Sequence, residues 1–267
     1  MSELSAERIK ATLETAWVGQ QIVYHPTLES TNDEAKQLAE TGIPNGTLVI
    51  ADHQTAGRGR LDRQWWSPPG SNLLLSLIFR QAFLAPHQAQ RLTMICSLAI
   101  CDAITQVTGL VAAVKWPNDV LVGGRKVCGL LAELTIARGQ LDYVIVGMGI
   151  NVNVDFKDDD VPAFASPPTS LKTETGQQVS RLAVLGTLLR RVESRYEQLR
   201  TGTPPHDEWQ ARLVTVGQAV RVTMPNRSLT GLAIGVDANG ALLVRQTDGE
   251  VERVLAGDVT LRMEDKS

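Results

Sequence analysis

The segment Lys115-Trp116-Pro117-Asn118-Asp119-Val120 places a cation, an amide and a carboxylate at the mouth of a predicted hairpin, which turns at Gly123-Gly124. The flanks of this segment, at residues 111–114, 120–122 and 127–134, are apolar and β-branched, as in buried strands. Side chains that carry chemistry gain from a rigid support of this kind. The pattern therefore predicts a chemically active loop held on a β-sheet.

A second polar segment lies earlier in the chain. Residues 54–60 read Gln-Thr-Ala-Gly-Arg-Gly-Arg, so two arginines alternate with glycines. Glycine lets the backbone approach a ligand closely, and arginine side chains can then reach the ligand's charge. Two loops suited to phosphate in one chain indicate an enzyme that handles a nucleotide and an acid.

Length and composition favour one main domain with a small appendage. The chain has 267 residues, of which 43% are hydrophobic, and a net charge of −3. This weakly acidic balance argues against a surface built for nucleic acid. The three cysteines lack CxxC spacing and the four histidines are scattered, which indicates buried thiols and no structural zinc. Because neither a signal peptide nor a long apolar run occurs, we expect a cytoplasmic protein without a membrane partner.

Hydrophobic periodicity predicts an α/β protein that changes character near its C-terminus. Strands are expected at residues 48–51, 72–79 and 143–151, helices at 5–15, 31–41, 89–108 and 181–200, and a polar surface loop at 155–169. Short alternating strands follow at residues 218–224, 229–236, 241–246 and 251–255, separated by glycine turns. We therefore expect a catalytic domain over residues 1–214 and a small β-barrel over residues 215–267.

Common nucleotide-binding and hydrolase motifs are missing from the sequence. Neither residues 57–62 nor residues 147–152 contain the third glycine of a dinucleotide-binding fingerprint. The chain also has no GxxxxGK[ST] motif and no GxSxG motif. These absences argue against a Rossmann enzyme, a P-loop NTPase and a serine hydrolase.

Five motifs in one order resemble those of biotin protein ligases. They are Ser30-Thr31-Asn32, residues 54–60, Lys115-Trp116-Pro117-Asn118-Asp119, Lys126-x-x-Gly129-x-Leu131-x-Glu133 and Gly147-x-Gly149-Ile150-Asn151. The resemblance implies an α/β catalytic domain with a mixed sheet, related to class II aminoacyl-tRNA synthetases, and a C-terminal SH3-like barrel. It also implies two reactions. Biotin and ATP give biotinyl-5′-AMP and pyrophosphate, and the biotinyl group then passes to one lysine of a biotin carboxyl-carrier protein of acetyl-CoA carboxylase or a related carboxylase.

The resemblance also implies a role for each matching residue. Lys126 and Arg60 would be catalytic, because cations must stand between the carboxylate of biotin and the α-phosphate of ATP. The biotin-binding residues would be Ser30, Thr31, Asn32, Gln54, Gly57, Arg58, Gly59, Arg60, Trp65, Lys126 and Gly129. The ATP-binding residues would be Arg58, Arg60, Arg63, Lys115, Asn118 and Asn151, with Asn151 at the adenine edge. Asp119 and Asn118 would hold Mg²⁺, which prefers oxygen ligands and keeps several waters.

Simpler interpretations stand beside these roles. Ser30 and Thr31 could serve only to cap a helix. Glu133 could be a surface partner of a lysine, so we leave it out of the site. Asp62 stands where the family commonly has glycine, which brings a negative charge toward anionic ligands. Two other functions stay open: a lipoate protein ligase, and a non-catalytic module that senses biotin or binds a protein.

Some members of this family carry an N-terminal helix-turn-helix domain that represses transcription. Three helices with their connections need about 40 residues, whereas 24 residues precede His25. We therefore expect the monofunctional form, a monomer or weak homodimer that binds no nucleic acid. The purified chain should give no sequence-specific gel shift with the DNA upstream of its biotin genes at physiological salt, with or without biotin and ATP. A nanomolar shift would contradict this expectation.

Overall fold

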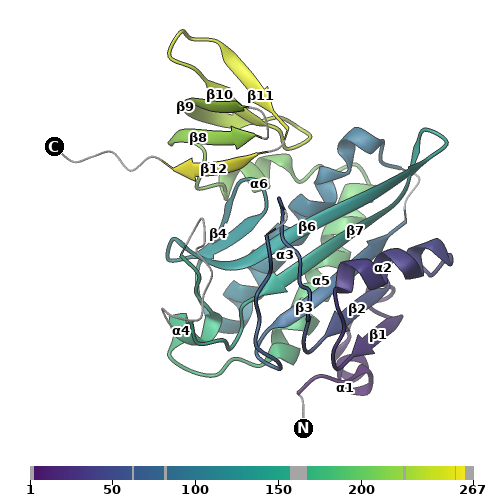
Figure 1. Cartoon of the computed structure of the whole chain (residues 1–267). Coiled ribbons are helices and arrows are strands. Elements are labelled where there is room, and N and C mark those ends of the chain that lie inside the picture. The colour runs from purple at the N-terminus through teal and green to yellow at the C-terminus, as the bar shows by residue number, and fades with distance from the viewer. Residues whose placement is uncertain are drawn as a thin grey trace.

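A computed structural model describes residues 3–61, 63–80, 83–156, 167–224, 227–255 and 257–261. Figure 1 shows a large sheet with helices on both of its faces and a smaller sheet formed by the last strands of the chain. Of the segment 155–169, which was expected to be a polar surface loop, residues 155–156 and 167–169 are described. Residues 157–166 lie outside the described part, as does Asp62.

The large sheet carries its strands in the order β1-β2-β3-β7-β6-β5-β4. The strands are β1 (Ile22–His25), β2 (Leu48–Ala51), β3 (Leu73–Phe79), β4 (Ala112–Lys115), β5 (Asp119–Val122), β6 (Arg125–Ala137) and β7 (Gln140–Ile150). The pair β1 and β2 is parallel, and all other neighbouring pairs of this sheet are antiparallel. The expected mixed sheet is therefore confirmed.

Helices cover both faces of this sheet and bury its centre. They are α1 (Ala6–Thr12), α2 (Thr31–Glu40), a 3₁₀ turn η1 (Pro86–Gln88), α3 (Gln90–Thr108), α4 (Leu171–Thr175), α5 (Arg181–Arg200) and α6 (His206–Ala211). On one face α2 packs Ala35 and Ala39 against Val49 and Ile78, whereas α3 and α5 pack into the main core on the other face. Strand β3 is buried along its whole length because it is covered twice, as its continuous apolar sequence predicts.

The helix α3 follows its sequence pattern closely. Its apolar residues recur at helical spacing and are buried, including Leu92, Ile95 and Ile100. The helix ends at Gly109, whose φ of 75° lies in the left-handed region that glycine adopts without strain. The long helix α5 has the bounds expected from the sequence.

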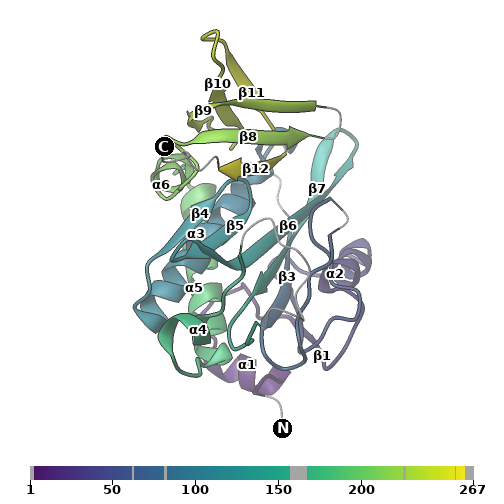
Figure 2. The same cartoon turned by 60° about the vertical axis from the view of Figure 1, so that its left-hand side comes forward.

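The C-terminal part is a five-stranded antiparallel sheet in the order β11-β10-β9-β8-β12. Its strands are β8 (Ala219–Met224), β9 (Arg227–Val236), β10 (Leu242–Arg245), β11 (Val251–Val254) and β12 (Asp258–Leu261). Figure 2 shows this sheet beyond the β4 and β5 end of the large sheet. We keep the boundary at residues 214/215 as a proposal, because Val214 still donates a 2.9 Å hydrogen bond to the carbonyl of Val114 in β4.

Two tryptophans of the large domain lie at its junction with the C-terminal sheet. Trp116, which is 1% exposed, donates its indole N–H to the carbonyl of Gly240 over 2.8 Å. Trp209 in α6 is fully buried and donates to the hydroxyl of Ser97 in α3 over 3.0 Å. Gly240 has a φ of 87°, and a Cβ there would lie 2.6 Å from the Cε of Met94. The turn before β10 is therefore packed directly onto the start of α3.

Some sequence expectations about burial and element content were wrong. Val111 is 82% exposed and Leu134 is 49% exposed, although both belonged to stretches expected to be buried. The second half of β6 extends past the end of β5, so one of its edges lacks the covering strand that the first half has. The short helices α4 and α6 and the last strand β12 were not expected, because each is too short to display a full apolar period.

All three cysteines are free and buried. Burial raises the pKa of the Cys101 thiol to about 11 and raises the pKa values of Cys96 and Cys128 as well. Among the helices that the structure describes, none combines the length and apolar character that crossing a bilayer requires.

Because the thiolate is the reactive form, the native protein should resist alkylation. Iodoacetamide at pH 8 should leave the folded chain unmodified, whereas the denatured chain should take up three equivalents, one for each cysteine. Mass spectrometry of the intact protein measures both states. Stoichiometric labelling of any cysteine in the folded protein would contradict the burial described above.

Candidate active site

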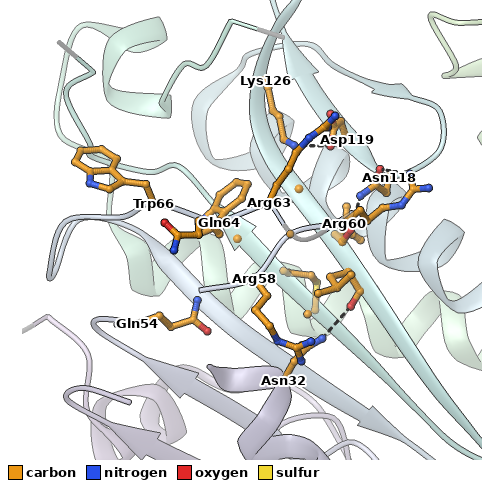
Figure 3. Close-up of a pocket in the computed structure, with 18 of the residues that line it drawn as sticks. Asn32, Gln54, Arg58, Arg60, Arg63, Gln64, Trp66, Asn118, Asp119 and Lys126 are labelled. Carbon is orange, nitrogen blue, oxygen red and sulfur yellow. Dashed lines mark hydrogen bonds and ion pairs between the residues drawn. The ribbon is translucent and has the colours of Figure 1, made fainter. Parts of the chain in front are cut away.

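The candidate site is a cavity of about 380 Å³ above strands β6 and β7. Figure 3 shows side chains from several separate segments of the chain pointing into it. Fourteen of the predicted site residues line the cavity: Ser30, Thr31, Asn32, Gln54, Arg58, Gly59, Arg60, Arg63, Trp65, Asn118, Asp119, Lys126, Gly129 and Asn151. The structure therefore brings together residues that the sequence separates widely.

Three glycines on β6 and β7 form the floor of this cavity. Gly129 in β6 is paired with Gly149 in β7, and Gly147 lies two residues before Gly149 on the same strand. A Cβ at Gly149 would lie 2.4 Å from the Trp65 ring, and one at Gly147 would lie 2.2 Å from the Oδ1 of Asn32. These distances are too short for real atoms, so only glycine lets Trp65 and Asn32 lie on the sheet.

A cluster of polar side chains stands at the start of α2. The Oε1 of Gln54 accepts hydrogen bonds from the backbone N–H of Thr31 at 2.7 Å and from its hydroxyl at 3.0 Å. The hydroxyl of Ser76 in β3 lies 2.8 Å from the Thr31 hydroxyl and 2.6 Å from the Oδ1 of Asn32. These contacts hold several donors and acceptors in fixed directions beside the glycine floor, as recognition of a polar ring requires.

Ser30 occupies the N-cap position of α2, but its side chain makes no capping hydrogen bond. Its hydroxyl instead belongs to the cavity lining. The interpretation of Ser30 as a helix cap alone was therefore wrong, because its side chain accepts no hydrogen bond from the first turn of α2. Gln54 accepts the N–H of Thr31, the first residue of the helix.

Glu133, which the sequence analysis left out, contacts two residues of the cavity lining. Its Oε2 accepts a 2.6 Å hydrogen bond from the Nδ2 of Asn32. Arg58 forms ion pairs with Glu133 at 3.0 Å and with Asp33 at 2.5 Å. Figure 3 shows the Arg58 guanidinium directed toward Asn32 and away from Lys126. Arg58 is thus held on the α2 side of the cavity.

Lys126 and Arg60 lie on the opposite wall. The Nζ of Lys126 is 2.7 Å from the Oδ1 of Asp119 and 5.5 Å from the centre of the Trp65 ring. Arg60 donates to the Oδ1 of Asn118 at 3.1 Å. Burial lowers the pKa of Arg60 below its ordinary value, because the charged form loses solvation there. An anion that entered the cavity would restore part of the lost stabilisation.

The C-terminal sheet reaches this wall. Arg60 also donates to the carbonyl of Gly257 at 3.3 Å, and Arg63 forms an ion pair with Asp258 at the start of β12. Asp258 lines the cavity. No local pattern in the sequence pointed to it, because its contact with Arg63 joins residues that are 195 positions apart.

Two predicted site residues stand outside the cavity lining. Gly57 lies behind it, where its carbonyl accepts from the N–H of Trp65 at 2.9 Å and a Cβ would lie 2.6 Å from the Trp65 carbonyl. Lys115 is opposite Asp119 in the β4–β5 pairing and is 8% exposed. Burial lowers its pKa, and Asp119 opposes that shift. Lys115 therefore lies beside the cavity on the adjacent strand, near the carboxylate of Asp119.

The two residues predicted to bind magnesium, Asn118 and Asp119, offer oxygen ligands, and each of these side chains contacts a cationic side chain of the protein. The Oδ1 of Asn118 accepts from Arg60, and the Oδ1 of Asp119 pairs with Lys126. Within the described ranges no three His, Cys, Asp or Glu side chains gather in a way that could hold a metal ion. One carboxylate and one amide oxygen fit Mg²⁺ that is carried mainly by nucleotide phosphates rather than by a protein cage.

Comparisons with known proteins agree with this geometry. Residues 24–151 match the Biotin/lipoate A/B protein ligase family, and residues 215–262 match the Biotin protein ligase C terminal domain. The chain is 35% identical over 264 residues to the Bifunctional ligase/repressor BirA of Bacillus subtilis, covering 97% of this chain and 79% of that protein. The chain belongs to the biotin protein ligase family. As a member it is an ATP-dependent biotin ligase, so the expected enzyme class is confirmed.

Two further relatives extend the comparison. The Biotin--[acetyl-CoA-carboxylase] ligase of Paracoccus denitrificans is 35% identical over 225 residues, which cover 83% of this chain and 92% of that protein. The biotin protein ligase of Aquifex aeolicus in complex with biotin and ATP superposes with a TM-score of 0.74 at 27% identity, covering 91% and 99% of the two chains. The expected α/β fold with an SH3-like C-terminal domain is thereby confirmed.

Replacing Glu133 with alanine should weaken the binding of biotin. The change removes the acceptor of Asn32 and one of the two acids that hold Arg58. A hydrogen bond to a charged group contributes about 1.5–3 kcal/mol, so the KM for biotin should rise about tenfold or more. Steady-state release of pyrophosphate measures the effect. Glu40→Ala, at the exposed end of α2, is the matched control and should leave the KM unchanged. An unchanged KM in both variants would remove Glu133 from the site.

Proposed function

We propose that this biotin ligase modifies one lysine of the biotin carboxyl-carrier protein of acetyl-CoA carboxylase or a related carboxylase. One observation supports the residue roles. Lys126 and Arg60 lie on one wall of the cavity, and the polar cluster of Thr31 and Gln54 lies on the other side of the glycine floor. One side of the cavity suits a neutral polar ring, and the other suits two anions. That division matches the two substrates, biotin and ATP.

The first reaction brings two anions together. A carboxylate oxygen of biotin attacks the α-phosphorus of ATP, the P–O bond to the β-phosphate breaks, and pyrophosphate leaves with its electron pair. Lys126 and Arg60 would stand between the carboxylate and the α-phosphate and stabilise the charge that gathers there. A positioned donor of this kind lowers a barrier by about 3 kcal/mol. Mg²⁺, when bound with ATP near Asn118 and Asp119, would supply further positive charge.

Binding of the adenylate would exchange the present partners of the cations. Lys126 contacts Asp119 and Arg60 contacts Asn118, and all four residues line the cavity. Ser30, Thr31 and Gln54 would hydrogen-bond the ureido ring of biotin, and Trp65 would cover it. Covering the ring also excludes water from the mixed anhydride, which hydrolyses readily.

The second reaction transfers the acyl group. The uncharged amine of the acceptor lysine attacks the acyl carbon of biotinyl-5′-AMP and an amide bond forms. The bond from that carbon to the phosphate oxygen breaks, AMP leaves with its electron pair, and the amine nitrogen releases one proton to solvent. The acceptor's name rests on the relative from Paracoccus denitrificans, whose printed name specifies acetyl-CoA carboxylase. Three reduced, buried cysteines support the cytoplasm as the place of reaction. A monomer or weak homodimer stays a prediction.

Pyrophosphate release separates the proposed function from its two alternatives. The protein should release pyrophosphate rapidly with biotin and ATP, and slowly or not at all with lipoate and ATP. A preference for lipoate would establish the lipoate ligase. Binding of biotin without release of pyrophosphate would establish a non-catalytic module. Biotinylation of a carrier domain, followed by mass spectrometry, tests the acceptor.

Replacing Lys126 with alanine should lower the rate of adenylation by about two orders of magnitude or more, because the meeting anions lose a cation. The melting temperature should change little, since Lys126 lies at the cavity and not in the core. Lys172→Ala is the matched control: Lys172 also forms a lysine–aspartate ion pair, with Asp155 at 2.5 Å, and neither residue lines the cavity. Wild-type turnover in the Lys126 variant would refute the assigned role.

A further inference from the structure

Asn72, directly before β3, is fully buried and does not line the cavity, yet its side chain contacts three residues around it. Its Nδ2 donates to the hydroxyl of Ser67 at 3.1 Å and to the Oδ1 of Asn151 at 3.4 Å. Its Oδ1 accepts from the backbone N–H of Val152 at 3.0 Å. Both N–H groups and the carbonyl of one amide are thus used, each on a different partner.

Asn151 is the cavity residue that depends most directly on this amide. Its Oδ1 receives the N–H of Asn72, and its own Nδ2 donates to the carbonyl of Thr169 at 3.1 Å. A rotation of the Asn151 amide by half a turn would place two acceptors against each other at Thr169 and two donors against each other at Asn72. The orientation of Asn151 is therefore fixed, and it keeps one N–H and one lone pair for a ligand.

Ser67 connects Asn72 to the arginine segment. Trp65 lies two residues before Ser67, and Arg63 two residues before that. Ser67 is 5% exposed. The far end of the segment that carries Arg58, Arg60 and Arg63 is thus anchored to the same amide that orients Asn151.

A buried ion pair supports Asn72 from behind. Arg181, at the start of α5, donates to the carbonyl of Asn72 at 3.3 Å and pairs with Asp52 at 2.8 Å. Asp52 also accepts from the hydroxyl of Tyr24 at 2.8 Å, and its carbonyl accepts from the N–H of Gly70 at 3.0 Å. The turn before β3 is therefore held on two sides, which limits how far Asn72 can shift.

We propose that Asn72 is a positioning residue for the nucleotide: it sets the orientation of the Asn151 amide, with Arg181 and Asp52 keeping Asn72 in place. The inference rests on the proposed function and on the role that the family resemblance implies for Asn151, at the adenine edge of ATP. Biotin depends less on Asn72, because its polar cluster is held by Gln54 and Ser76. Loss of Asn72 should consequently weaken ATP binding selectively.

The test uses Asn72→Asp, which keeps the shape and the acceptor for Val152 but replaces the donating Nδ2 with an oxygen. Asn72→Ala removes the amide without adding a charge and serves if the aspartate variant does not fold. Calorimetric titration of ATP into protein saturated with biotinol, the alcohol that replaces the carboxyl group of biotin, gives the Kd for ATP without turnover. We expect this Kd to rise about fivefold or more, while the Kd for biotin changes at most about twofold.

The control is Asn45→Ala. Asn45 anchors the opposite end of β3, where its Oδ1 accepts from the N–H of Arg80 at 2.9 Å, and its loss should leave both Kd values unchanged. In an Asn151→Ala background, Asn72→Ala should add less than about twofold to the Kd for ATP, because Asn72 acts through Asn151. Full additivity of the two changes, or an unchanged Kd for ATP in folded Asn72 variants, would overturn the proposal.

The proposed function and this inference fail in different ways. Wild-type protein that binds ATP but releases no pyrophosphate with biotin would refute the ligase reaction and leave the positioning role of Asn72 intact. Wild-type protein that releases pyrophosphate, together with an Asn72 variant that binds ATP like wild type, would refute only the positioning role.

Discussion

The absence of side chains at three neighbouring positions of β6 and β7 is the constraint on which the site depends. Gly129 and Gly149 face each other across the two strands, and Gly147 lies beside them. Without Cβ atoms the sheet surface is hollow there, so Trp65 and Asn32 can rest on the backbone. A methyl group at any of these positions would push these side chains outward and take volume from the cavity. The chemistry of the site is thus built on a backbone surface, and the charged side chains stand at its rim.

The cations around this hollow surface are held by oxygens of the protein itself. Arg58 is paired with Asp33 and Glu133, and Lys126 is paired with Asp119. The net charge of the protein is −3 and its substrates are anions, so the protein as a whole repels them. Cations that are held at the cavity oppose this repulsion locally. Each cation is kept in place by an oxygen that a phosphate or carboxylate oxygen can replace or join. Binding therefore requires less reorganisation than a cavity of unpaired arginines would need.

Local patterns allowed much of the fold and the site to be predicted. Gly109 marked the end of α3, the apolar run of β3 marked a doubly covered strand, and the ordered motifs located Thr31, Gln54 and Lys126. Contacts between distant segments gave no such signal. Glu133 reaches Arg58 across 75 positions, and the amide of Asn72 reaches Asn151 across 79. Ser76 could have been found, since it is the one polar residue in the apolar run of β3. Periodicity states which face a residue occupies, but not which residue stands opposite.

The packing of Trp116 has a consequence for how the chain comes apart. This indole is buried at the junction of the two sheets, where it donates to the carbonyl of Gly240, and the turn that carries Gly240 lies on α3. Detaching the C-terminal sheet would expose the Trp116 ring and leave its N–H without an acceptor at the same moment. The hairpin with Asn118 and Asp119 would lose its backing in that event. The two parts should therefore melt as a single cooperative unit, and a nucleotide bound at the hairpin would stabilise both of them together.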